Sequence, residues 1–192
     1  MKTLICKAPI ILIALLLHGC AAPLLVAGGA VGATLANDRR EAAALIDDQS
    51  IEIRLRNLLK NEKSLAVDSH LSVISFNRVV LLTGQVRHQS QYDQIVALVQ
   101  KEKGIQRLHN EIQVTAPISM GTRTQDTWIT AKVKNALLNH ADLNAIQVKV
   151  ITEDGTVYLM GLVARSEGQV AAQAAQQVSD VKGVIKVFEY LD

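Results

Sequence analysis

The residue types that usually carry catalysis are spread thinly through this sequence of 192 residues. The five histidines stand at positions 18, 70, 88, 109 and 140, and none has the spacing to a Cys or a second His that a zinc site needs. His140 near Asp142 is typical of a helix end rather than of a catalytic base. No glycine-rich phosphate loop and no nucleophile elbow occur. The sequence therefore indicates neither an enzyme nor a protein with a metal or an organic cofactor.

The spacing that does indicate a chemical property lies in residues 126–138, which hold the only Trp of the chain. On a helix, Ile129, Val133, Ala136 and Leu137 would fall within about 100 degrees and form an inward face. Trp128 would point well away from them, with Lys132, Asn135 and Asn139 on its side and with Ala131 and Leu138 further round. Lys134 lies on the same outer surface, and no acid occurs between Asp126 and Asp142.

An exposed Trp and Leu beside two lysines are typical of a surface that dips into a lipid headgroup layer. The indole ring is apolar while its N–H prefers water. A lysine can lay its stem on lipid and its charge near phosphate. The competing interpretation is that Trp128 caps the core or fills an interface within the protein.

This helix opens the second copy of an internal repeat, which should be sought before the fold is assigned. Residues 48–59 match 126–137, residues 79–86 match 156–163, and residues 104–112 match 183–191. Ser90 and Ser166 each begin a second helical run. The offset between the copies is 78 residues in the helix, 77 at the strand glycine and 79 at the end, which loop insertions would explain.

Each copy predicts the order helix, strand, strand, helix, strand, and hence an α+β unit with one helical layer and one sheet. Asp48 and Asp126 are expected as N-caps of the first helices. The hairpins are expected to turn at Asn77-Arg78 and at Glu153-Asp154-Gly155. Ser166 with Gln169 fits a capping box for the second helix of copy two.

The inner faces of the second helices are expected to be apolar, with Ile95, Val96 and Val99 in copy one and Val170, Ala174 and Val178 in copy two. A unit of about 65 to 70 residues is near the lower limit for an independent core, so packing of the two copies on each other is expected.

Gly84 and Gly161 lie inside predicted strands, where glycine costs stability. A bend or a close approach of a helix backbone would explain them. The alternative is a ligand that passes over the strand.

The first 19 residues read as a secretory signal, with Lys2 and Lys7 before an apolar run that is too short for a comfortable membrane span. The sequence Leu17-His18-Gly19-Cys20 resembles a bacterial lipobox, in which the Cys is lipidated and becomes the N-terminus. After cleavage Cys20 would be the only Cys of the chain, without a disulfide partner. An ordinary signal peptide with a chance Cys is the alternative.

Residues 20–46, rich in Ala and Gly at their start, are expected as the lipidated Cys and a flexible tether. Insertion of residues 24–36 into the bilayer is the other possibility. Removal of residues 1–19 leaves 18 basic and 18 acidic residues. A neutral mature chain argues against nucleic acid as a partner.

The D-x-x-I helix opening, the hairpin that ends in x-G-x-V and the final G-V-x-x-V strand resemble the BON domain. The resemblance implies BON domain 1 at residues 47–115, a linker at 116–124 and BON domain 2 at 125–192. Each is expected as αββαβ, with a three-stranded mixed sheet packed against two helices.

Two such domains behind a lipobox resemble the dual-BON outer-membrane lipoproteins, and Ala21 after the Cys implies sorting to the outer membrane. That family implies an anchor on the periplasmic side, with acyl and diacylglycerol groups on Cys20 as the only attached group. It also implies binding of an anionic phospholipid such as phosphatidylglycerol, enrichment at the division site, and a role in envelope integrity and outer-membrane protein assembly.

In that family the first helix of BON domain 2 carries lipid binding. The expected phospholipid-binding residues here are Thr127, Trp128, Thr130, Ala131, Lys132, Lys134, Asn135 and Leu138.

Copy one lacks these features, since Ser50 stands for Trp128, Glu52 for Thr130 and Lys60 for Leu138. Its outer face is expected to be solvated. Ile53 is the exception, and a contact with copy two would explain an apolar residue at that position. Lipid binding is therefore assigned to copy two alone. A scaffold that binds an envelope assembly machine or a peptidoglycan enzyme, through a sheet edge or the Trp128 face, is the alternative.

Replacement of Cys20 by Ala should release the protein from the membrane fraction, because several acyl chains on one residue give a stable anchor. The measurement is immunoblotting of membrane and soluble fractions of cells that carry each form. Equal membrane fractionation of Cys20→Ala and the wild type would contradict the anchor.

Overall fold

The computed structural model describes residues 38–65, 68–141 and 143–192. Arg39 to Asp192 form one compact unit, which is the unit described below. The predicted signal sequence, Cys20 and most of the predicted tether lie outside the described residues.

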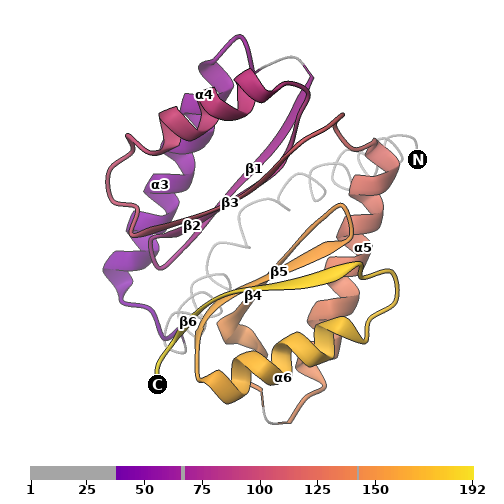
Figure 1. The fold of residues 1–192 in the computed structure, drawn as a ribbon. Helices are drawn as coiled ribbons and strands as arrows, with labels where there is room; N and C mark the ends of the chain where they lie inside the picture. The colour runs from indigo at the N-terminus through magenta and orange to yellow at the C-terminus, as the bar shows by residue number, and fades with distance from the viewer. Residues whose placement is uncertain (1–37, 66–67, 142) are drawn as a thin grey trace, which may run out of the picture. The chain divides into compact units, whose positions relative to one another are not determined.

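Two copies of one arrangement of helices and strands follow each other along the chain (Figure 1). Copy one contains α3 (Ala42–Asn61), β1 (Ser69–Phe76), β2 (Val79–Val86), α4 (Gln89–Val99) and β3 (Arg107–Val114). Copy two contains α5 (Met120–Leu138), the short 3-10 helix η2 (Ala145–Gln147), β4 (Val148–Glu153), β5 (Thr156–Val163), α6 (Arg165–Gln176) and β6 (Gly183–Tyr190).

Each copy folds its three strands into one mixed sheet, in the orders β1-β2-β3 and β4-β5-β6. The hairpin pairs are antiparallel, and the last strand joins the central strand in parallel after a helical crossover. The two-residue turns have positive φ at Asn77, Arg78, Asp154 and Gly155, as type I′ hairpins require. The predicted αββαβ order, fold class and turn positions are confirmed.

The helices of each copy cover one face of their own sheet. In copy one Ile51, Leu55 and Leu59 of α3 pack with Val80 and Leu82 of β2. In copy two the corresponding cluster joins α5, α6 and the inner face of β4 and β5. In α6 the buried face is made mainly of Ala171, Ala172, Ala174 and Ala175, while Val170 is only partly buried. Val178, expected on the same helix, is partly buried but lies beyond the end of α6.

The opposite faces of the two sheets share a third apolar cluster, so the copies pack on each other. It contains Phe76, Val79 and Leu81 from copy one and Tyr158, Met160 and Val187 from copy two. All eight residues of β2 are therefore buried. The expectation that the two small units bury a common surface is confirmed.

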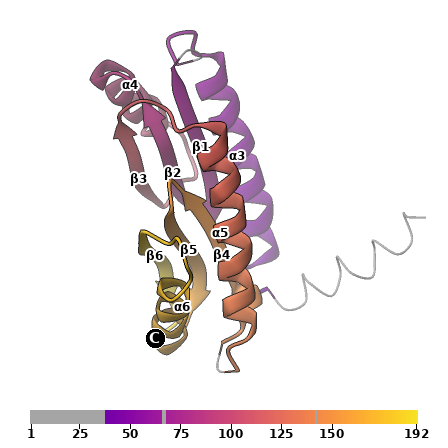
Figure 2. The same cartoon turned by 90° about the vertical axis from the view of Figure 1, so that its right-hand side faces the viewer.

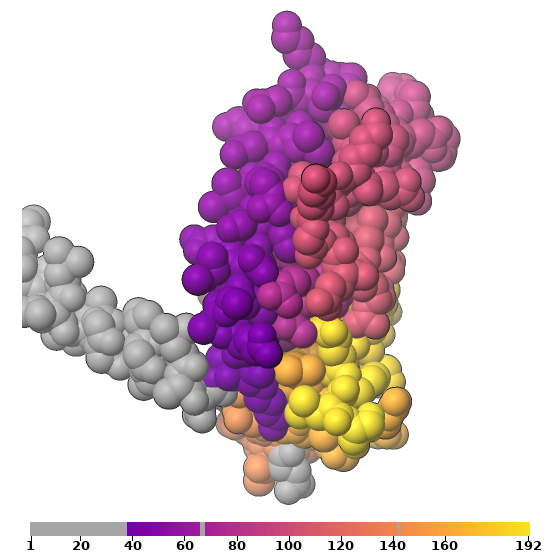
Figure 3. Space-filling model, turned by 90° about the vertical axis from the view of Figure 1, so that its left-hand side faces the viewer, coloured from indigo at the N-terminus to yellow at the C-terminus, as the bar shows by residue number. Residues whose placement is uncertain are grey.

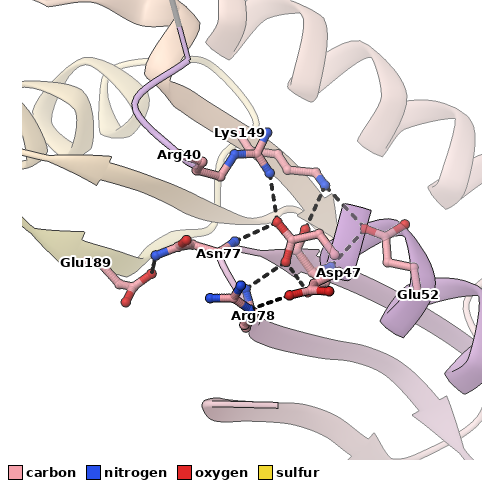
Figure 4. A network of polar contacts seen from close by, with 9 residues as sticks. Arg40, Asp47, Glu52, Asn77, Arg78, Lys149 and Glu189 are labelled. Atoms are coloured by element: carbon pink, nitrogen blue, oxygen red, sulfur yellow. Dashed lines mark hydrogen bonds and ion pairs between the residues drawn. The ribbon is translucent and has the colours of Figure 1, made fainter. Parts of the chain in front are cut away.

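Polar contacts also join the two copies (Figure 4). Lys149 of copy two lies 3.4 Å from Glu52 of α3, and Asn77 donates to Glu189 at 3.0 Å. Nearby, Gln85 donates to the buried Glu153 at 2.9 Å. Burial raises the pKa of the Glu153 carboxyl. Its ionised form therefore destabilises the folded state increasingly as the pH rises through that value.

The predicted N-cap roles of Asp48 and Asp126 are wrong. α3 begins six residues before Asp48, and α5 begins at Met120, where the Ser119 side chain accepts from the Thr122 N–H. The helices thus enter the segments expected as tether and linker. Asp48 instead accepts from the turn N–H groups of Asn77 and Arg78 at 2.7 Å each. Asp126 accepts from Asp154 and Gly155 at 2.9 and 2.8 Å.

The second helices also begin earlier than Ser90 and Ser166. Gln91 and Glu167 reach back to the N–H groups of His88 and Ala164, at 3.1 and 2.8 Å. The serines lie inside the first turn because these longer side chains already satisfy the helix start.

The alignment of the last strands was off by three residues. Ile112 pairs with Gly84 and Phe188 pairs with Gly161, so Ile112 corresponds to Phe188 and not to Leu191. Both are buried in the core of their own copy, and this burial sets the register.

Gly84 and Gly161 stand where a neighbouring backbone approaches closely. A Cβ at Gly84 would overlap the carbonyl oxygen of His70, and one at Gly161 would overlap that of Gln147. Gly84 also has φ +124°. At Gly84 the approaching backbone belongs to the neighbouring hairpin arm, and at Gly161 it belongs to Gln147, the last residue of the 3-10 helix η2. Protein atoms therefore occupy the space that a ligand would need.

Replacement of Gly161 by Val should destabilise the fold by about 1–3 kcal/mol, because the side chain must displace backbone. The melting temperature should fall by roughly 2–10 °C. Gly183→Val is the matched control, since nothing lies within 4 Å of a Cβ at Gly183. An unchanged melting curve for Gly161→Val would contradict the close approach as the reason for glycine.

Candidate functional site

Helix α5 separates its residues into a packed face and an open face. Ile129, Val133 and Leu137 are buried in the core of copy two, as the sequence predicted, and Ala136 is partly buried. No described element covers the opposite side of the helix in Figure 2. The side chains of that side are therefore available to another molecule.

The open face carries large apolar side chains. Trp128 is 67% exposed and Leu138 is 66% exposed. Thr127, Ala131, Lys134 and Asn135 are also exposed. Met120, at the first position of the helix, is 72% exposed and joins the same side at helical spacing. We call Met120, Thr127, Trp128, Ala131, Lys134, Asn135 and Leu138 the α5 outer face.

Met120 was missed from the sequence because residues 116–124 read as a linker. The Ser119 N-cap three residues before Thr122 was the local signal that could have placed it on the helix.

The exposure of Trp128 decides between the two interpretations of that residue. A ring that caps the core or fills the interface between the copies would be largely buried. At 67% exposure, Trp128 does neither within the described part of the chain.

The polar groups of two predicted site residues are engaged within the protein, although 40% of the Lys132 side chain remains exposed. Thr130 donates to the Thr152 hydroxyl of β4 at 2.7 Å. Lys132 donates to Asp180 at 2.7 Å and to the Ser179 carbonyl at 3.2 Å. The hydrogen bond from Lys132 lowers the pKa of the Asp180 carboxyl.

The contact of Lys132 is a feature of both copies. Arg54, the counterpart of Lys132 by the 78-residue offset, donates to Glu102 at 2.6 Å and to the Lys103 carbonyl at 3.1 Å. Both cations thus tie the first helix to the loop before the last strand. Lys134 has no ion-pair or hydrogen-bond partner among the described residues, which leaves its ammonium free to meet an anion.

The α5 outer face has no carboxylate. The one acidic residue of the helix is Asp126, and its side chain is buried against the hairpin turn. The surface is therefore apolar with a cationic component. No helix in the described ranges is long and apolar enough to span a membrane.

The outward side of α3 differs from that of α5. Ser50 is only half-buried where Trp128 is exposed. Glu52 is not solvated as predicted, because it accepts from the Ser75 N–H at 2.8 Å and pairs with Arg56 and Lys149. Ile53 is 49% exposed and is not part of the apolar cluster that joins the two copies.

A cleft of about 320 Å³ lies between α5, β4 and β1, on the inner side of α5. Its lining includes His70, Arg123, Asp126 and Glu153. Burial, followed by the charge of Arg123, lowers the pKa of His70. With two carboxylates around one guanidinium, this cleft does not favour an anion.

Comparison with known proteins gives one family over most of the chain. The BON domain model matches residues 47–116 and 125–192. A protein of Haemophilus influenzae named outer membrane lipoprotein DolP is 37% identical over 176 residues, which cover 92% of this chain and 91% of the relative.

Two further relatives are more distant. The 21 kDa hemolysin of Actinobacillus pleuropneumoniae is 34% identical and covers 80% of this chain and 79% of its own. Osmotically-inducible protein Y of Escherichia coli is 28% identical over 72% of this chain and 70% of its own.

Proposed function

The chain belongs to the BON-domain family, and from this membership and the α5 outer face we propose that it is an outer-membrane lipoprotein whose second BON domain binds anionic phospholipid. The name of the Haemophilus relative, at 37% identity over nearly the whole chain, supports the membrane and the lipoprotein class. The anchor is assigned to Cys20, which lies outside the described residues, and the folded part to the periplasmic side.

The observation that carries the lipid proposal is an exposed Trp on an α5 face without carboxylates. Trp128 and Leu138 leave about two thirds of their surface in water. Exposed apolar surface is unfavourable in water, and contact with the acyl chains at the membrane boundary would remove this free-energy cost. The indole N–H would stay at the headgroup level. Asn135 supplies a hydrogen-bond donor and Lys134 a charge for phosphate oxygens, while the Thr127 hydroxyl already donates to the Arg123 carbonyl at 3.0 Å.

The attraction of this face alone is weak. One free lysine contributes about 1 kcal/mol near an anionic surface. The acyl anchor raises the local concentration of the face at the bilayer, so a weak second contact becomes effective. A phosphatidylglycerol-like lipid suits this face, because its charge is met by Lys134.

Enrichment at the division site and support of envelope integrity follow as further proposals from the family resemblance. Outer-membrane protein assembly machinery is the proposed protein partner. A scaffold role without direct lipid recognition is the competing proposal. Site-specific crosslinking from Trp128 in cells, set beside lipid titration of the same protein, separates a protein contact from a lipid contact.

Replacement of Trp128 by Glu should weaken binding of residues 39–192 to phosphatidylglycerol vesicles at least about tenfold, equivalent to roughly 1.4 kcal/mol. The reason is that a carboxylate replaces the apolar anchor and repels the anionic surface. Vesicle sedimentation measures the binding. Ile46→Glu is the matched control, since Ile46 on α3 is also 67% exposed and should tolerate the change without loss. Undiminished vesicle binding by Trp128→Glu, with an unchanged melting curve, would sink the proposal.

The two lysines of α5 should behave differently. Lys134→Ala should lower vesicle binding about fivefold, equivalent to roughly 1 kcal/mol. Lys132→Ala should change it less than about twofold, because Lys132 is engaged with Asp180. The same sedimentation assay measures both variants at low and high salt. A larger effect of Lys132 than of Lys134 would show that the ion pair opens at the membrane.

A further inference from the structure

A cleft on copy one, away from α5, adjoins an open sheet edge. The cleft has a volume of about 510 Å³ and lies between α3 and β1. Its lining consists of Arg56, Leu59, Lys60, Leu65, Ser69, Leu71 and Val73. The outward surface of α3 is visible in Figure 3, in indigo to purple.

β1 is an edge strand, because it pairs only with β2 in its sheet. Val73 accepts from Arg56 at 3.2 Å, and the Ser75 N–H donates to Glu52 at 2.8 Å. These groups therefore point away from β2. In an antiparallel pair the outward residues alternate, so the N–H and C=O of Leu71 also point outward.

The two ends of this edge differ in whether their outward backbone groups have hydrogen-bond partners. At Ser75 the outward groups are sealed, since Glu52 accepts from its N–H and Lys149 donates to its C=O at 3.3 Å. At Leu71 the outward backbone groups have no partner among the described residues, and the same holds for the N–H of Val73. An unpaired edge is a template for another strand.

Copy two does not repeat this edge. The counterparts of Ser69 and His70, by the 77-residue offset, are Ile146 and Gln147. They belong to the 3-10 helix η2, so β4 has six residues where β1 has eight. At Val148, the counterpart of Leu71, the backbone N–H donates to the Ala145 carbonyl of η2. The edge of β4 is therefore partly closed at the position where the edge of β1 is open.

From this combination we propose that copy one binds an extended peptide segment of a partner protein, which adds a strand to β1 beside Leu71 and Val73. Main-chain hydrogen bonds to the open edge would supply affinity. Apolar side chains at alternate positions of the peptide would enter the cleft against Leu59, Leu65 and Leu71.

The charge of the cleft selects the kind of peptide. Two of the seven lining residues are basic and none is acidic. Arg56 is paired with Glu52 at 2.6 Å, while Lys60 has no partner among the described residues. An acidic side chain of the peptide beside Lys60 is therefore favoured. A second copy of this chain would bring its own Arg56 and Lys60 to the edge and be repelled.

The test is selection of a phage-displayed library of random nonapeptides against the full lipidated chain in detergent micelles. The expected peptides alternate apolar and polar residues and carry an acid, and they slow amide exchange at Leu71 and Val73. Overturning results are the absence of enriched peptides, protection at another surface, a dimer of the chain in light scattering, or protection of Leu71 by phosphatidylglycerol vesicles alone.

N-methylation of a selected peptide tests the strand geometry without a change to the protein. Methyl groups on the amides that face β1 should abolish binding, and methyl groups on the alternate amides should leave it within about twofold. Equal effects at both sets of positions would overturn strand addition.

A charge exchange tests the role of Lys60. Lys60→Glu should weaken the acidic peptide about fivefold, as expected for an exposed charge pair of roughly 1 kcal/mol, and a peptide with Lys in place of the acid should recover the loss. Lys134→Glu is the control and should leave peptide binding unchanged. Since Lys60→Glu should not alter vesicle binding, failure here is distinct from failure of the lipid proposal; an unchanged peptide affinity would overturn the charge selection.

Discussion

Each copy depends on a buried aspartate that joins its first helix to its hairpin. A buried carboxylate is costly unless hydrogen bonds satisfy it, and a tight hairpin turn exposes N–H groups that need an acceptor. Asp48 and Asp126 meet both needs at once, with distances of 2.7 to 2.9 Å. The bond fixes where the helix lies along the sheet. The apolar residue three positions later, Ile51 or Ile129, then enters the core.

The helices cover one face of each sheet, and the two remaining faces pack against each other. The shared cluster of Phe76, Leu81, Tyr158 and Met160 buries these faces. A separate buried contact between the copies joins Gln85 to Glu153. It costs stability when Glu153 is ionised, as the raised pKa of Glu153 indicates. In this orientation of the two copies Glu153 accepts a hydrogen bond from Gln85, and a shift of one copy on the other would leave the buried carboxyl without that partner. Since both faces of each sheet are covered, the outward helix faces and the strand edges are the surfaces on which the copies can differ.

Features that depend on residues close together in the sequence could be predicted, whereas features that depend on contacts between distant residues could not. Helical spacing identified Ile129, Val133 and Leu137 as core and left Trp128 outside, because periodicity is a local property. The role of Asp126 was missed, since its partners are 28 and 29 residues away. The partner of Lys132 is 48 residues away, and no local pattern separates it from Lys134. The register of the last strand depended on burial of Ile112 and Phe188, which the sequence alignment of the copies could not weigh.

The chain enters this folded part through two arginines that hold different copies. Arg39 makes a two-pronged contact with Glu167 of copy two, at 2.6 and 2.9 Å. Arg40 contacts Asp48 of copy one at 2.9 Å and lies 4.1 Å from the centre of the Phe76 ring. A force applied to the chain before Arg39 would therefore act on both copies. In copy one it would act through Asp48, the residue that joins α3 to the hairpin. Because both copies belong to one compact unit and are held at this point of entry, a bilayer contact by α5 and a peptide contact by β1 would act on the same folded unit.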